Sequence, residues 1–136
     1  CYGEIDTRVH IGKQEDIQQV DAEIIIKDLT QRYFRFLCKY RDQGYKILVW
    51  GVPPSGHGAH DAHPRYSTRA QRNVLSKRIN QYFKESCNTH NIEFISIWED
   101  ITERNVENYF SYFLDAIHLS YPPCKELIDN KFKRYY

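Results

Sequence analysis

The sequence contains no methionine, no long apolar run and almost no net charge. No stretch approaches the roughly 20 apolar residues that a membrane-spanning helix needs, and no segment has the pattern of a signal peptide. Lysine and arginine number 19 against 18 acidic residues, a formal net charge of +1. This balance lacks the basic excess typical of proteins that bind nucleic acids or anionic membranes. We therefore expect neither nucleic acid nor a membrane among its partners.

The four cysteines form no CxxC pair, so they give no support to a zinc or redox site. Cys38 and Cys87 fall in stretches with helical periodicity, where partly buried and reduced thiols are the usual outcome. Reduced thiols favour an intracellular, cytoplasmic protein. Because a cytosolic chain of natural origin normally begins with methionine, we also expect this sequence to be a fragment or a processed product.

Metal and nucleotide sites find little support. His57, His60 and His63 have a spacing that would suit zinc ligands on a helix. Gly58 and Pro64 disfavour a helix there, and we interpret the run as a solvated loop. The chain also lacks a glycine-rich phosphate loop, which leaves a nucleotide-binding α/β domain with little support. We predict no metal and no cofactor.

Hydrophobic periodicity predicts alternating helices and strands in one domain over residues 1–136. Residues 17–40 repeat apolar side chains every three or four positions, with Asp16 as a cap and Gly44 as a stop. Short apolar runs at 45–50 and 92–98 indicate buried strands. The expected inward positions of the first helix are Ala22, Ile25, Leu29, Tyr33, Phe36 and Tyr40.

Between these strands we expect a loop over residues 51–64 and a helix from Ser67 or Thr68 to about Asn88. A looser segment over 99–121 precedes a last helix opened by two prolines. The alternation predicts an α/β fold with a parallel sheet. Two strands make a thin sheet, so we expect its first strands to come from an upstream segment or a partner chain. The expected inward positions of the second helix are Val74, Leu75, Ile79, Tyr82 and Phe83.

Polar residues concentrate after the strands, where ligands bind in open parallel sheets. The first such segment, residues 3–10, follows what we interpret as a strand end at the start of the chain. The others are residues 51–54, Glu99 with Asp100, and residues 115–118. Asp115 and His118 have the spacing D-x-x-H, in which the carboxylate can orient the imidazole as a general base. The spacing alone is a weak signal and is more typical of an aspartate that caps a turn with a surface histidine.

The order of several short motifs resembles one group of SGNH/GDSL-type hydrolases. Residues 3–11 resemble the segment G-E-I-D-x-R-x-H-I of that group, and residues 52–54 resemble its following strand end. Residues 69–73 resemble its arginine-containing helix start, and residues 115–119 are similar to its last block, D-x-x-H-L. The resemblance covers nearly the whole chain and corresponds to the C-terminal part of the domain.

The resemblance implies a flavodoxin-like, three-layer α/β/α fold and a serine esterase site. It assigns His118 as general base and Asp115 as its orienting acid. The Gly-Asp-Ser block that carries the nucleophile is absent from these residues, and we expect it upstream. Ile5 stands where the family has an asparagine that donates to the oxyanion, and an isoleucine cannot donate.

Asp6, Arg8 and His10 are predicted to bind substrate, because three complementary side chains alternate after a strand. The alternative to substrate binding is a purely structural role, in which Asp6 caps the loop and Arg8 forms an ion pair. We expect these residues to share a cleft with His118.

The leading hypothesis is an ester hydrolase or acyl-transfer domain that acts on a small-molecule or glycan ester, such as an acetylated glycan. The alternative is a non-catalytic binding module with a degenerate pocket, which the absent serine and Ile5 favour. The enzyme assignment depends on the upstream serine. Ser55 lies after two prolines in an expected mobile loop, and Ser120 follows His118 closely, so neither is a predicted nucleophile. We therefore expect no esterase activity from the chain alone.

Overall fold

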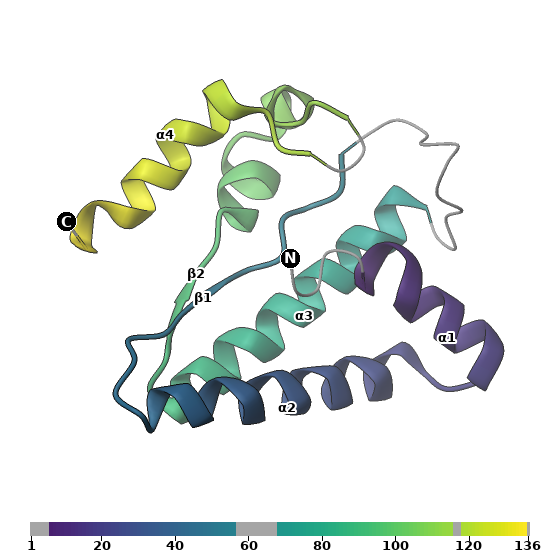
Figure 1. The fold of residues 1–136 in the computed structure, drawn as a ribbon. Helices are drawn as coiled ribbons and strands as arrows, with labels where there is room; N and C mark the ends of the chain where they lie inside the picture. Colours follow the sequence, from purple (N-terminus) through teal and green to yellow (C-terminus); the bar gives the residue numbers. More distant parts are fainter. Residues whose placement is uncertain (1–5, 57–67, 116–117, 136) are drawn as a thin grey trace.

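A computed structural model describes residues 6–56, 68–115 and 118–135 (Figure 1). The described chain is largely helical, with two short strands. The elements in order are the π-helical turn η1 (Asp6–His10), α1 (Ile11–Gln18), α2 (Ala22–Arg41), β1 (Leu48–Trp50), α3 (Arg69–His90), β2 (Glu93–Ile95), the π-helical turn η2 (Asp100–Arg104), the 3-10 helix η3 (Val106–Tyr112), α4 (Tyr121–Phe132) and the 3-10 turn η4 (Lys133–Tyr135).

The helix expected over 17–40 is divided in two. Gln19 adopts a left-handed conformation with φ 53°, which ends α1. Asp21 then caps α2, since its carboxylate accepts a hydrogen bond from the backbone nitrogen of Glu23 at 2.7 Å. The prediction of one helix capped by Asp16 is therefore wrong, and Asp21 is the cap.

The buried face of α2 lies about one residue away from the predicted one. Phe34 packs on Phe83 of α3 with ring centroids 5.9 Å apart, and this contact sets which side of α2 faces inward. Phe36 and Tyr40, predicted to be inward, are exposed, and their rings contact each other instead. The buried residues of α2 are Ala22, Ile26, Thr30, Phe34 and Leu37.

Helix α3 begins at a capping box. The side chain of Thr68 accepts from the backbone nitrogen of Gln71, and the Gln71 side chain accepts from the backbone nitrogen of Thr68. The predicted cap at Thr68 is confirmed. Ile79 and Phe83 are buried as expected, whereas Val74 is exposed. The helix packs against α2 and runs in the same general direction, since Arg41 at the end of α2 donates to the carbonyl of His90 at the end of α3 at 2.6 Å.

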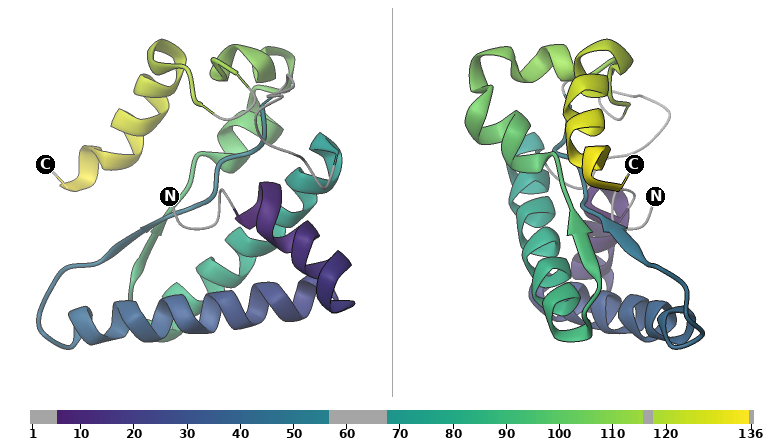
Figure 2. Two further views of the ribbon diagram at one scale, coloured as in Figure 1. Left: turned by 45° about the vertical axis from the view of Figure 1, so that its right-hand side comes forward. Right: turned by 90° about the vertical axis from the view of Figure 1, so that its left-hand side faces the viewer.

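Strands β1 and β2 pair in parallel through the α3 crossover, with Val49 opposite Phe94. Successive strand residues face opposite sides, and Val49 and Trp50 accordingly enter different hydrophobic clusters. Val49 joins the first core, which α1, α2 and α3 supply. Trp50 joins the second core, whose other members come from residues 97–128. Figure 2 shows α4 and α2 on different sides of the strand pair.

The predicted flavodoxin-like, three-layer fold is wrong. In the described ranges only two strands form, of three residues each, and helices dominate. The apolar run 92–98 yields only three strand residues, because the Ser96 hydroxyl accepts from the backbone nitrogen of Trp98 and the chain turns into helix at Trp98. A sheet of this width cannot form a central layer of the predicted kind.

The last helix closes the second core. The prolines predicted to open it, Pro122 and Pro123, lie in the first turn of α4. The ring of Phe132 stacks on Trp50 at 6.0 Å, and Lys131 forms an ion pair with the buried Asp100 at 2.7 Å. Within the part of the chain described, no helix is both long and apolar enough to cross a membrane.

Candidate functional site

The loop after β1 is held in place by two asparagines of α3. Asn80 is buried and accepts from the backbone nitrogen of Val52 at 2.7 Å, while its amide donates to the Val52 carbonyl at 2.9 Å. About two turns earlier in α3, Asn73 accepts from the backbone nitrogen of Ser55 at 2.8 Å. The segment 51–56 is thus fixed at the carboxyl end of the strand pair, where parallel sheets place ligands.

Ser55 lies in a buried polar cluster rather than in a mobile loop. It is 2% exposed, its hydroxyl accepts from Nε of Arg72 at 3.2 Å, and its carbonyl accepts from the Tyr109 hydroxyl at 2.6 Å. Asn73 donates in turn to the Tyr109 oxygen at 3.0 Å. Burial raises the pKa of Tyr109, although the Asn73 hydrogen bond and nearby arginines oppose this shift. The expectation of mobility at Ser55 is wrong because these contacts fix both its backbone and its hydroxyl.

This cluster was not predicted from the sequence. The sequence did contain an indication of it. The polar residues Arg72, Ser76 and Asn80 recur every four positions, and they lie on the buried face of α3. A guanidinium that is only 3% exposed requires hydrogen-bonding partners. Polar residues at this spacing would have predicted buried hydrogen bonds between α3 and the loop after β1.

A tight turn carries Asp115 and His118 beside this loop. Phe113 and Leu119 form an antiparallel bridge. The backbone nitrogen of Leu114 donates to the carbonyl of His118 at 2.8 Å. The turn is therefore a small hairpin whose base rests on the second core through Phe113.

The carboxylate of Asp115 contacts His118 at two points. One oxygen accepts from the backbone nitrogen of His118 at 2.7 Å, and the other lies 2.8 Å from Nδ1 of the ring. The predicted contact between these side chains is confirmed. Because Nδ1 is engaged by the carboxylate, Nε2 is the nitrogen that can act on a substrate. The imidazole is 66% exposed, so solutes reach it.

Gly56 joins the turn to the loop after β1. A Cβ atom at this position would lie 2.3 Å from the carbonyl oxygen of Asp115 and 2.9 Å from the ring of Phe113. The Phe113 ring also lies 5.3 Å from that of Tyr109. The exposed imidazole is consequently supported by the same loop that Asn73 and Asn80 hold.

The other predicted site residues lie in η1. The segment is a π-helical turn rather than the expected loop, so Asp6 and His10 meet at a spacing of four, with His10 Nδ1 3.0 Å from Asp6 Oδ1. The turn packs against α1 and α3. The side chain of Arg8 lies outside what the structure describes. A cleft shared by this turn and His118 stays a prediction.

No described serine contacts the imidazole of His118. The described hydrogen bond of the ring, at Nδ1, goes to Asp115. The Ser55 hydroxyl accepts from Arg72, and no described hydrogen bond joins the hydroxyl of Ser120 to His118. The described residues thus place a carboxylate against an exposed imidazole, and no described serine hydrogen-bonds to that imidazole.

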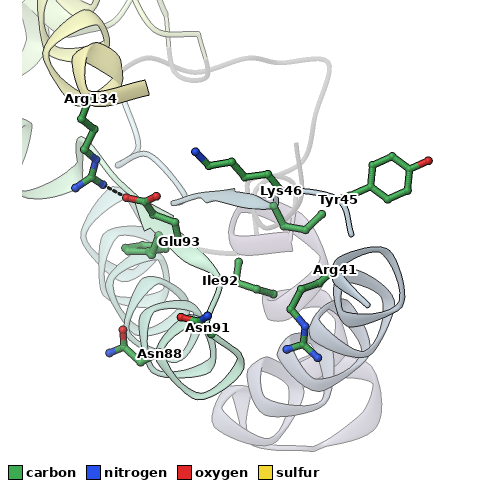
Figure 3. Close-up of a pocket in the computed structure, with 10 residues that line it drawn as sticks. Arg41, Tyr45, Lys46, Asn88, Asn91, Ile92, Glu93 and Arg134 are labelled. Carbon is green, nitrogen blue, oxygen red and sulfur yellow. Dashed lines mark ion pairs between the residues drawn. The ribbon is translucent and has the colours of Figure 1, made fainter. Parts of the chain in front are cut away.

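A polar hollow of about 520 Å³ lies at the opposite, amino end of the strand pair (Figure 3). Its two guanidinium groups are already engaged. Arg134 pairs with Glu93, and Arg41 binds both Asp42 and the carbonyl of His90. Lys46, which also lines the hollow, has its ammonium group 4.9 Å from the ring centroid of Tyr135. We take the Asp115–His118 turn as the candidate site because its exposed imidazole is oriented by a carboxylate.

Among the described residues no group of three histidine, cysteine or carboxylate side chains is placed to bind a metal. His57, His60 and His63 lie outside the described residues. Cys38, Cys87 and Cys124 are free thiols. Comparisons of the chain with protein-family models, curated proteins and solved structures give no significant match.

Proposed function

We propose that the chain supplies the acid–base half of a serine-type ester hydrolase or acyl-transfer site. The observation that carries the proposal is the contact of Asp115 with Nδ1 of an exposed His118. A histidine oriented in this way is a general base for a hydroxyl nucleophile. The resemblance to SGNH/GDSL-type hydrolases supports the same two roles.

In the proposed reaction, Nε2 of His118 accepts the proton of a serine hydroxyl while that oxygen attacks the acyl carbon. The ester C–O bond breaks, and the leaving alcohol takes the proton from His118. Water or a second alcohol then attacks the acyl-serine and loses its proton to His118. The bond between the acyl carbon and the serine oxygen breaks, the serine oxygen takes that proton back from His118, and an acid or a new ester is released. Asp115 stabilises the imidazolium formed in each half-reaction. The serine and the oxyanion donors come from a Gly-Asp-Ser segment outside these 136 residues.

The proposed substrate is an acylated glycan or a small ester. Asp6 and His10 offer a carboxylate and an imidazole on one turn, and with Arg8 they are the proposed contacts to its polar groups. No metal and no cofactor take part in the proposed chemistry.

The test compares the 136-residue chain with a longer protein that carries the Gly-Asp-Ser segment. On p-nitrophenyl acetate the chain alone should match the buffer blank, after correction for free thiols and histidines. The longer protein should turn over, and His118→Ala should lower its kcat by about 10³-fold or more. Turnover by the chain alone that disappears in Ser55→Ala or Ser120→Ala would place the nucleophile inside it and contradict the proposal.

A second candidate is a non-catalytic binding module that keeps the polar turn. The absence of any described serine at His118 favours it, as does Ile5 in place of an oxyanion donor. A longer protein that folds, carries the serine and still gives no turnover would select this alternative.

A further inference from the structure

Three aromatic rings lie exposed in a row at the end of α2 and in the segment that follows it. Phe36 contacts Tyr40 with ring centroids 5.0 Å apart, and Tyr40 contacts Tyr45 at 6.0 Å. Phe36, Tyr40 and Tyr45 are 53%, 41% and 62% exposed. Neighbouring rings are inclined by 59° and 68°, so they form no single flat surface. A cluster of exposed rings marks an interaction surface, because each ring gains free energy when a partner covers it.

Basic side chains accompany these rings. Between Asp28 and Asp42 the chain carries no acidic residue. Arg32 and Lys39 lie four residues before and three residues after Phe36, spacings that place side chains on one face of a helix. The small net charge of the whole chain therefore does not describe this end of α2. The basic residues between the two aspartates are Arg32, Arg35, Lys39 and Arg41.

Several of these cations lack an ion pair. Arg32 and Arg41 each pair with a neighbouring aspartate. In the described ranges Arg35 and Lys39 form none, although both are exposed and lie four residues apart. Like charges at this spacing destabilise a helix. Lys46 forms no described ion pair either, and its ammonium group lies near an aromatic ring instead. A local cost without a compensating contact inside the fold is expected where a partner supplies the opposite charge.

The row of rings ends at the polar hollow of about 520 Å³. Tyr45 and Lys46 line this hollow together with Asn88 and Asn91 (Figure 3). Within the described chain, the side-chain amides of Asn88 and Asn91 make no hydrogen bond, and both residues are exposed. Such amides offer donors and acceptors in one plane. The basic and aromatic face thus continues into a surface that can form hydrogen bonds.

The arrangement fits a single-stranded polynucleotide better than a membrane. A helix that lies on a membrane inserts its apolar face into the lipid, and the apolar face of α2 is already buried in the first core through Ile26, Phe34 and Leu37. Proteins that bind single strands combine cations along the backbone with separate rings on which bases stack. In a duplex the bases are paired and stacked, so the rings could not reach their faces.

We propose that the end of α2 and the segment after it form a binding face for single-stranded nucleic acid. Unpaired bases stack on the exposed rings, and phosphates pair with the cations that lack a partner. The inference goes beyond the proposed function and uses none of its residues. It replaces the expectation from net charge, which the uneven distribution of the charge makes inapplicable to this face. The rings are Phe36, Tyr40 and Tyr45, and the cations are Arg35, Lys39 and Lys46.

The test measures binding to the 136-residue chain by fluorescence anisotropy. The probes are labelled oligothymidylate and oligouridylate of about ten nucleotides, a usual site size. At least one should bind saturably, and the tighter one identifies DNA or RNA as the partner. With three phosphate contacts, log K should fall with log salt concentration at a slope of about −2. A duplex of the same length should bind more weakly than the single strands.

Phe36→Leu should weaken binding about tenfold, because leucine keeps the apolar volume but cannot stack on a base. Phe36→Trp should restore it. Tyr121→Leu is the matched control, since Tyr121 is an exposed ring at the start of α4, away from the end of α2. Lys39→Gln should make the salt slope shallower by about 0.7. Lys13→Gln, at an exposed lysine of α1 without a described ion pair, should leave the slope unchanged.

Four outcomes would overturn the proposal. The first is no saturable binding of either oligonucleotide, and the second is an equal loss in Phe36→Leu and Tyr121→Leu. The third is binding of dextran sulfate as tight as that of the oligonucleotides with no effect of Phe36→Leu, which would show a site for any polyanion. The fourth is tighter binding to vesicles of phosphatidylcholine and phosphatidylserine, which would assign the face to a membrane. His118→Ala should leave oligonucleotide binding intact, so the outcome is independent of the hydrolase proposal.

Discussion

Gly56 lies so close to the backbone of Asp115 that no residue with a side chain fits at position 56. The nearest neighbour of a Cβ at Gly56 is the Asp115 carbonyl oxygen, at 2.3 Å, which is backbone and cannot rotate away. The orientation of the Asp115–His118 turn therefore depends on a residue that itself has no side chain.

Gly56→Ala should displace Asp115 and the Phe113–Leu119 bridge and destabilise the fold by about 1–3 kcal/mol. Chemical denaturation measures the free energy of unfolding, and the His118 amide resonance reports the displacement. Gly44→Ala is the control. It costs backbone strain at φ +91°, but its Cβ meets nothing within 4 Å, so the His118 resonance should stay in place. An unchanged His118 resonance in Gly56→Ala would contradict the contact.

Asp115→Asn should change the tautomer of His118. The carboxylate accepts at Nδ1, so the neutral ring carries its proton there. An asparagine still accepts from the backbone nitrogen of His118 but can offer Nδ1 its amide donor instead of an acceptor. The imidazole ¹⁵N shifts should move from the Nδ1–H pattern toward Nε2–H, with the turn preserved. Identical ¹⁵N shifts in both proteins would show that Asp115 does not orient the ring.

Asn80→Ala should destabilise the protein by about 2–3 kcal/mol, because it leaves the backbone nitrogen and carbonyl of Val52 without partners in a buried site. Thermal or urea denaturation measures the loss. Asn88→Ala, on an exposed position of the same helix, should change stability by less than about 0.5 kcal/mol. Equal effects from the two substitutions would contradict the stabilising role assigned to the hydrogen bonds between Asn80 and Val52.

Stability should fall at alkaline pH through Cys87. Burial raises the pKa of this thiol from about 9 to about 12. Below pH 9 both states keep the proton, whereas between about pH 9 and pH 12 only the unfolded chain releases it, which favours unfolding. The free energy of unfolding should therefore decline over that range, and less steeply in Cys87→Ala. Burial also raises the pKa of Tyr109 and of Tyr112, so part of the slope should remain. A slope unchanged in Cys87→Ala would contradict this assignment.

Local signals were the ones that the sequence conveyed well. The capping box at Thr68, the proline start of α4 and the Asp115–His118 contact all join residues one to three positions apart. Such contacts follow from backbone geometry alone. The position of the strands was also predicted, although their length was not.

Contacts between distant segments could not be predicted in this way. The rotation of α2 depends on Phe83, about fifty residues after Phe34, and the burial of Phe34 instead of Phe36 follows from it. The same holds for Ser55, whose partners lie in α3 and η3. Apolar periodicity marks a face to within about one residue, and packing decides the rest.

The separation of the two cores has a consequence for motion in the folded protein. Phe113, at the base of the His118 turn, belongs to the smaller cluster with Tyr112 and Cys124, whereas the long helices α2 and α3 stabilise the larger one. Clusters of unequal size open with different free energies, and the smaller one opens first. Amides of residues 112–115 and 118–124 should then exchange with deuterium before those of α3. His118 would lose its placement in such partial openings while most of the chain stayed folded.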